Sequence, residues 1–196
     1  MEAFSDGVLA IAITLLVLNL RTASVPGQVG HDILAQWPTY LAYIASFLYI
    51  GVVWVNHHSL FTRIAQVDGG LLWCNLALLL AASVLPFPTA ELAFAMGQGT
   101  HADRVSALIL YAVVSSTMGF TWLLTFSYLI KHPALLAPAV SGQFFRTERK
   151  RAVIGILAPA VPVAVGLWSP TAALVVMVAT PIFYIATADG LRSGQR

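Results

Sequence analysis

Ser5 and Asp6 are polar residues at the start of an otherwise apolar run that continues to Leu20. A carboxylate in or near lipid is costly, so it normally has both a partner and a role. Further along the chain, Trp54 and His58 are spaced i, i+4, which places an indole and an imidazole on one face of a helix. Because imidazole titrates near neutral pH, this set of residues has the chemistry for proton transfer or for a buried hydrogen-bond network.

Two roles stay open for these four residues. If the start of the first helix and the end of the second lie at one membrane level, Asp6 can meet Trp54 and His58. The indole and imidazole would then satisfy the carboxylate, and Ser5, Asp6, Trp54 and His58 would form a structural polar network that locks the first helix to its neighbours. The alternative is a proton relay of Asp6 with His58, which would make the chain a proton-coupled membrane transporter. The sequence lacks the internal inverted repeat that many such transporters carry.

Metal and enzyme sites are not expected. His57 and His58 are adjacent, so on a helix their side chains point about 100° apart and form a poor chelate. The single cysteine, Cys74, excludes an intrachain disulfide. The sequence has no Gly-x-Ser-x-Gly, no His-Glu-x-x-His and no glycine-rich phosphate loop. We therefore expect no catalytic residues, no metal and no cofactor.

A stripe of Ile11, Thr14, Leu15 and Leu18 follows Asp6 at i, i+3, i+4, i+7 spacing. These side chains fall within an arc of roughly 100°, and Asp6 lies roughly on the other side of the helix. Such a stripe either packs against other helices or converges with its copies around a symmetry axis. In the second case it forms a narrow hydrophobic constriction with a ring of hydroxyl dipoles. The pattern alone is compatible with both.

The composition indicates a polytopic membrane protein. Charged residues make up 9% of the 196 residues and hydrophobic residues 59%, and the mean hydropathy is +0.83. A soluble domain usually has about 25% charged residues. A formal net charge of +2 is too small to indicate nucleic-acid binding. The apolar runs are continuous and lack the alternation of an outer-membrane barrel.

The chain divides into six apolar segments, each long enough for a membrane helix of about 20 residues. We predict a single all-α transmembrane domain over residues 1–196, with helices at about 4–20, 38–61, 71–90, 105–130, 152–168 and 171–188. The last two helices are joined by a short turn at Ser169-Pro170. They carry Pro159, Pro162 and Pro181, so we expect kinks there.

Basic residues predict the orientation. An even number of helices places both termini on one side of the membrane. If that side is the cytoplasm, it carries eight basic residues against two outside, as the positive-inside rule requires. The cytoplasmic set is Arg63, Lys131, Arg146, Arg149, Lys150, Arg151, Arg192 and Arg196, and the outer set is Arg21 and Arg104. The largest cluster falls in a predicted 131–151 loop, where it either flanks the membrane or contacts anionic lipid.

Three motifs resemble the transmembrane protein 175 family, the bacterial homologues of an endolysosomal potassium channel. The first is residues 4–18, which begin Phe4-Ser5-Asp6. The second is residues 54–61, Trp-Val-Asn-His-His-Ser-Leu-Phe. The third is residues 85–90, Leu-Pro-Phe-Pro-Thr-Ala. Together they cover about the first 95 residues, and the order and lengths of the six spans agree over the rest.

The resemblance implies a potassium-permeable cation channel with modest selectivity for potassium over sodium. It implies a homotetramer of six-helix subunits in a bacterial plasma membrane, with a pore lined by the first helix and no pore loop. The matching constriction residues are Ile11, Leu15 and Leu18, and Thr14 matches the hydroxyl layer linked to selectivity. The expected partners are potassium ions and membrane lipid. The family motif also carries an Arg four residues before its Phe, a position that would precede Met1 here.

Overall fold

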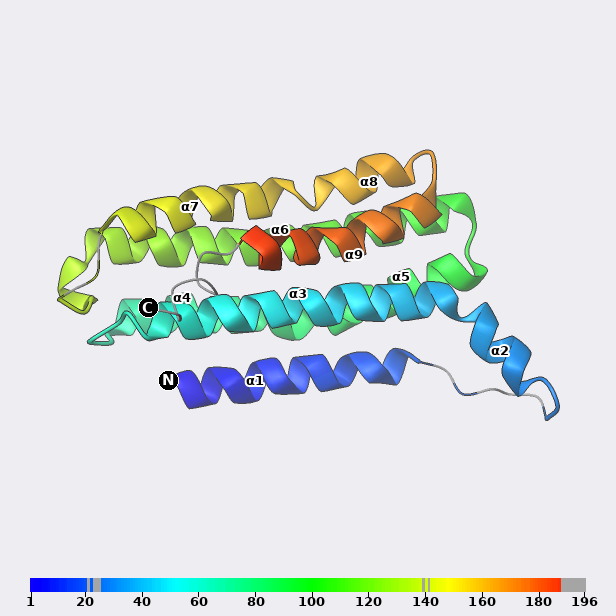
Figure 1. Cartoon of the computed structure of the whole chain (residues 1–196), viewed down its shortest axis with the longest axis horizontal. Helices are drawn as coiled ribbons and strands as arrows, with labels where there is room; N and C mark the ends of the chain where they lie inside the picture. The colour runs from blue at the N-terminus through cyan, green and yellow to red at the C-terminus, as the bar shows by residue number, and fades with distance from the viewer. Residues whose placement is uncertain (21, 23–25, 139, 141, 188–196) are drawn as a thin grey trace.

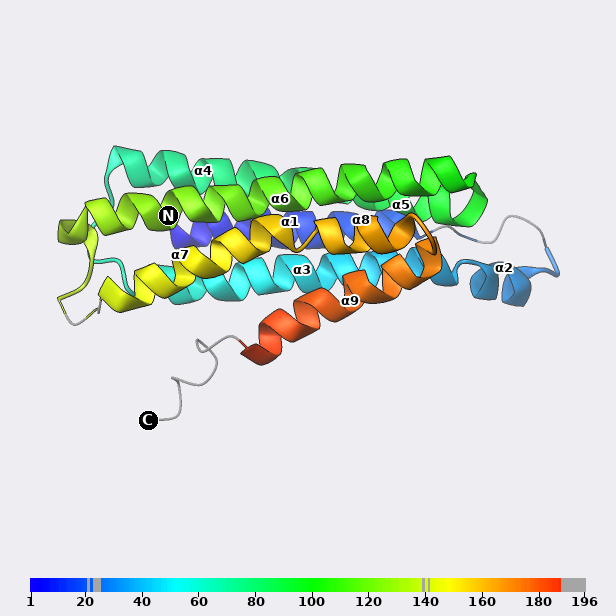
Figure 2. The ribbon, with the colours of Figure 1, turned by 90° about the horizontal axis from the view of Figure 1, so that it is seen from above.

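The computed structural model describes residues 1–20, 22, 26–138, 140 and 142–187. Over these residues the chain is helical and contains no β-strand, so the predicted all-α class is confirmed. The helices are α1 (Glu2–Leu15), continued by the 3-10 turn η1 (Leu16–Asn19), then α2 (Val29–Ala35), α3 (Trp37–Phe61), α4 (Gly69–Val84), α5 (Pro86–Gln98), α6 (His101–Lys131), the 3-10 turn η2 (Pro133–Leu135), α7 (Gly142–Leu157), α8 (Ala160–Gly166) and α9 (Pro170–Thr187). The long helices lie side by side along one axis (Figures 1 and 2).

Four segments of the described chain are helical, long enough and apolar enough to cross a bilayer. They are Glu2–Asn19, Trp37–Phe61, Gly69–Gln98 and His101–Lys131, and Pro170–Ile182 is a shorter apolar helix. These helices do not by themselves confirm the predicted count of six, and the single six-helix domain stays a prediction. Figure 1 shows the ends of α3 and α6 at the same end of the bundle as the N-terminus. Arg21, Arg192 and Arg196 of the predicted charge distribution lie outside the described residues.

Prolines explain two differences from the predicted boundaries. The third segment continues past residue 90 to Gln98, because Pro86 and Pro88 lie in the first turn of α5, where a helix does not need their missing N–H groups. The predicted helix 152–168 is instead interrupted between Leu157 and Ala160, at Pro159, which cannot donate to the preceding turn. Pro181 is accommodated inside α9.

The basic cluster lies on a helix, which corrects the predicted 131–151 loop. Helix α7 begins at Gly142, so all four basic residues between Arg146 and Arg151 are helical. The fully buried Phe145 anchors this first part of α7 to the bundle. Arg151 donates to Glu148 one turn earlier at 2.7 Å, and this contact stabilises the helix. The stretch is too polar to be predicted as a membrane span.

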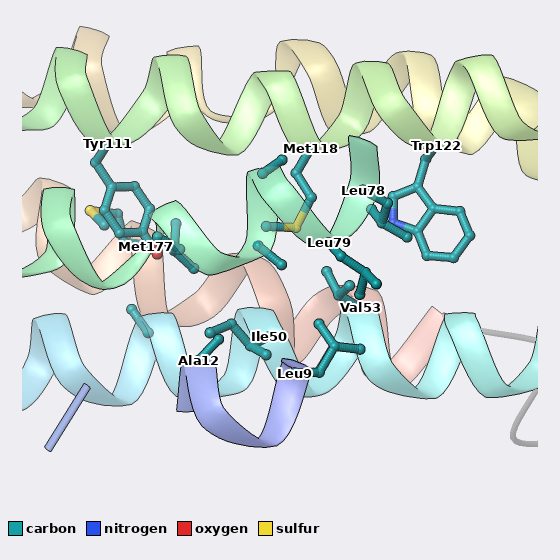
Figure 3. Close-up of a cluster of buried hydrophobic side chains, with 14 of the residues drawn as sticks. Leu9, Ala12, Ile50, Val53, Leu78, Leu79, Tyr111, Met118, Trp122 and Met177 are labelled. Atoms are coloured by element: carbon teal, nitrogen blue, oxygen red, sulfur yellow. The ribbon is translucent and has the colours of Figure 1, made fainter. Parts of the chain in front are cut away.

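Helix α1 packs on α3 and α4 with one face only. Leu9 and Ala12 are 1% exposed and Leu16 is fully buried. Figure 3 shows Leu9 and Ala12 against Ile50 and Val53 of α3, with side chains of α4, α6 and α9 completing the apolar core. Figure 1 shows α1 at the edge of the bundle, so its opposite face meets no other described helix.

Small and polar residues hold the other helices together, as is usual where lipid removes the hydrophobic drive between helices. A Cβ on Gly119 of α6 would lie 2.9 Å from the Gly155 carbonyl carbon of α7, so these two backbones are in direct contact. The buried Ser46 hydroxyl lies 2.8 Å from Thr89 Oγ1 and 3.1 Å from Tyr111 Oη, and so joins α3, α5 and α6.

Candidate functional site

The stripe on α1 points away from the rest of the protomer. Ile11 is 61% exposed, Leu15 42% and Leu18 74%, whereas the face formed by Leu9 and Leu16 is buried. Large aliphatic side chains left uncovered on one helix face indicate contact with lipid or with another chain. The structure therefore argues against the interpretation of this stripe as the core of a single protomer.

Thr14 lies on the same exposed face, between Ile11 and Leu15. Its hydroxyl donates to the Ile11 carbonyl oxygen at 2.9 Å, one turn earlier. The donor is thus used within the helix, and the lone pairs of Oγ1 remain available to accept or to face a cation.

A buried trio joins the first turns of α1 to α3 and α4. Ser5 and His57 are fully buried and Asn75 is 3% exposed. Asn75 Nδ2 donates to Ser5 Oγ at 3.0 Å, and His57 Nε2 lies 2.8 Å from Asn75 Oδ1. Because an amide oxygen can only accept, Nε2 is the nitrogen of His57 that carries the proton.

Two pairs with more exposed side chains lie beside the trio at the same end of α1. Trp54 Nε1 donates to Asp6 Oδ1 at 2.9 Å. His58 Nδ1 lies 2.7 Å from Glu2 Oε1. The Trp54 and His58 rings are stacked with centroids 6.2 Å apart, as their i, i+4 spacing requires.

The structure thus brings together some of the predicted residues and separates others. Asp6 meets Trp54, but His58 takes Glu2 rather than Asp6 as its partner, because Glu2 lies one turn before Asp6 on the same side of α1. Ser5 faces inward to Asn75 rather than to Trp54. The adjacent imidazoles of His57 and His58 point to different partners.

Sequence reasoning missed the roles of Glu2, His57 and Asn75. Asn75 carried a usable signal, because an amide within an apolar span needs a partner just as Asp6 does. The described residues contain no group of three or more His, Cys, Asp or Glu side chains that could hold a metal ion.

An all-helical chain with several apolar helices, one of them exposing an aliphatic stripe and fixed at one end by hydrogen bonds, has the fold class of a multi-pass membrane protein. The family model described as "Endosomal/lysosomal potassium channel TMEM175" matches residues 1–86. A potassium channel of Streptomyces collinus is 41% identical over 168 residues, which cover 85% of this chain and 80% of the relative. The chain belongs to the TMEM175 family, whose named members are channels and not enzymes.

Two further relatives extend the comparison. The crystal structure of a lysosomal potassium-selective channel TMEM175 homolog from Chamaesiphon minutus superimposes with a TM-score of 0.80, at 29% identity and with 94% of each chain covered. An endosomal/lysosomal proton channel TMEM175 of Gallus gallus is 36% identical over 123 residues, which cover 56% of this chain but only 25% of that protein.

Proposed function

We propose that this protein is a potassium-permeable channel in which copies of α1 line a central pore. The observation that carries the proposal is the outward direction of Ile11, Leu15 and Leu18 on a helix whose other face is buried. The proposal is supported by the membership of the TMEM175 family and by the bacterial relatives that are named potassium channels.

In the proposed homotetramer, four copies of each stripe residue form stacked rings around the axis. The rings of Ile11, Leu15 and Leu18 make the narrowest part of the pore, where an ion sheds part of its hydration shell. Potassium is the more easily dehydrated ion, so it passes more readily than sodium. Thr14 adds a ring of hydroxyl oxygens at this level. Selectivity is modest, because side chains rather than a cage of backbone carbonyls replace the lost water.

The hydrogen bonds at the first turn of α1 fix the phase of the stripe. A rotation of α1 by one residue, about 100°, would break the Ser5–Asn75 and Asp6–Trp54 contacts together and turn the stripe away from the axis. We assign Ser5, Asp6, Trp54 and His58 this positioning role, with Glu2, His57 and Asn75. The proposed setting is a bacterial plasma membrane with both termini in the cytoplasm.

Recordings from planar bilayers, with potassium on one side and sodium on the other, test the proposal. The wild-type protein should give unitary currents whose reversal potential shows preference for potassium. Leu15→Ala should change the conductance or shift the reversal potential. The matched control is Leu80→Ala, which removes a side chain of α4 that is 68% exposed and away from the stripe. Currents that respond equally to both substitutions, or to neither, would exclude α1 as the pore lining.

Proton transport is the second candidate, because the vertebrate relatives are named proton channels. The contact of His58 with Glu2 gives one titratable pair at the end of α1, and Asp6 lies on the same side of the helix. A reversal potential that follows an imposed pH gradient, in solutions with equal potassium on both sides, would favour this function over potassium conduction. Saturating transport without unitary currents would indicate a proton-coupled transporter.

A further inference from the structure

We propose that a cavity within each protomer, between α3, α6, α7 and α9, holds one acyl chain of an anionic phospholipid. The cavity has a volume of about 560 Å³, within the range of about 300–1,000 Å³ that is usual for ligand sites. It is separate from the exposed stripe of α1, and the proposal does not depend on ion conduction. Figure 2 shows α9 diverging from α7 after the turn that joins α8 to α9.

The shape and lining of the cavity fit a hydrocarbon chain. Its wall on α6 runs from Leu108 to Phe126, a rise of about 27 Å at 1.5 Å per residue. Most of the lining is aliphatic or aromatic, and Ala112, Gly119 and Ala179 provide width along it. A cavity of this volume and length accommodates a single extended acyl chain.

The charge at one end of the cavity favours an anionic head group. Glu148 and Arg151, an ion pair at 2.7 Å, line the cavity near the middle of α7. Arg146, Arg149 and Lys150 surround them on α7, so this helix carries four basic residues and one acidic residue between positions 146 and 151. A phosphodiester at this end would lie beside basic side chains at the membrane surface while its acyl chain enters the cavity.

Binding can be measured with delipidated protein in detergent, titrated with phosphatidylglycerol or with phosphatidylcholine of the same chain length. Native mass spectrometry counts the lipids bound per chain. Lipids with brominated chains report on Trp122, which lines the cavity and is 8% exposed. We expect one phosphatidylglycerol per chain, with saturable quenching that Trp122→Phe removes. Phosphatidylcholine should bind at least about fivefold more weakly, since one basic contact at a membrane surface has roughly that effect.

Two matched pairs of variants separate this site from nonspecific lipid. Ala112→Phe fills the cavity and should abolish saturable binding, whereas Val113→Phe on the outer face of α6 should retain it. Ala179→Phe fills the same space from α9 and serves if Ala112→Phe does not fold. Arg151→Gln should reduce the preference for phosphatidylglycerol, and Lys150→Gln, an equal change of charge outside the cavity lining, should reduce it less.

Several results would overturn the proposal. These are equal binding of the two lipids, equal effects of Ala112→Phe and Val113→Phe, and saturable binding of free stearate without binding of phosphatidylglycerol. A change in oligomer size caused by Ala112→Phe, with lipid binding intact, would also do so, because it would make this face an interface between copies of the chain.

Discussion

Replacing Asn75 by Leu should lower the free energy of unfolding, although Asn75 carries no charge. The change removes the amide that links α1 to α3, and it leaves the buried Nε2–H of His57 without its acceptor. An orphaned buried donor costs about 1–3 kcal/mol. Ser5 loses less, because its hydroxyl also lies 3.3 Å from the Met1 carbonyl oxygen. Hydrogen bonds between membrane helices average only about 0.6 kcal/mol. We therefore expect a total loss of about 1–3 kcal/mol.

A double-mutant cycle distinguishes an orphaned donor from a general loss of packing. His57→Phe in the Asn75→Leu background removes the donor as well, and replacing both partners by apolar groups is often nearly neutral. The second substitution should therefore recover part of the loss, with a coupling of about 1 kcal/mol. Unfolding of the purified protein in mixed detergent micelles, followed by tryptophan fluorescence, measures each corner of the cycle. Zero coupling, or an Asn75→Leu protein as stable as wild type, would refute the role assigned to the buried trio.

Further predictions concern contacts elsewhere in the bundle. Gly119→Ala should destabilise the protein by about 1–3 kcal/mol, because its Cβ would press on the backbone of α7. Gly51→Ala has open space around its Cβ and should be neutral or stabilising by up to about 1 kcal/mol in the same detergent unfolding assay. Glu2→Gln removes the charge beside His58 and should lower the stability by less than 1 kcal/mol, as is usual for an exposed pair; a larger loss in detergent unfolding would show that this pair is not merely peripheral. Asp68 accepts from the Leu71 backbone N–H and from Tyr128 Oη, and these bonds hold the pKa of its carboxyl below the ordinary value. The Asp68 carboxylate therefore contributes to the free energy of unfolding above the pKa that it has in the unfolded chain, and this contribution is lost as the pH falls through its lower pKa in the folded protein. Asp68→Asn should accordingly reduce the dependence of the free energy of unfolding on pH in that acidic range.

The sequence was most informative for α1, whose two faces lie in different environments. The spacing of Ile11, Thr14, Leu15 and Leu18 identified a coherent face of α1, and topology alone brought the end of α3 to the start of α1. Which of two adjacent histidines turns inward depends on the rotational phase of α3, and this phase is set by the packing of α3 against α1, α5 and α9. For that reason His57, rather than His58, takes the buried position next to Asn75.

Other features depended on local chemistry that the apolar pattern does not record. The apolar pattern placed residues 146–151 in a loop, because they are too polar for a membrane span. They lie instead on α7, which is supported by the burial of Phe145 and by the ion pair of Glu148 with Arg151. The cavity could not be predicted from the sequence either, since it arises from the divergence of α9 and from small residues on four different helices.

The polar attachment of α1 has a mechanical consequence. In the described part of the chain, its side-chain hydrogen bonds to α3 and α4 come from Glu2, Ser5 and Asp6, all within its first two turns. Beyond them, the buried contacts of α1 with the bundle are apolar and extend to Leu16, so a tilt of α1 about its start would be opposed by packing and not by side-chain hydrogen bonds. Leu18 lies about 20 Å from Ser5 along the helix axis, and a tilt of only about 5° would displace it sideways by nearly 2 Å. A small tilt of α1 about its first turn would therefore produce its largest displacement at the end that carries Leu18.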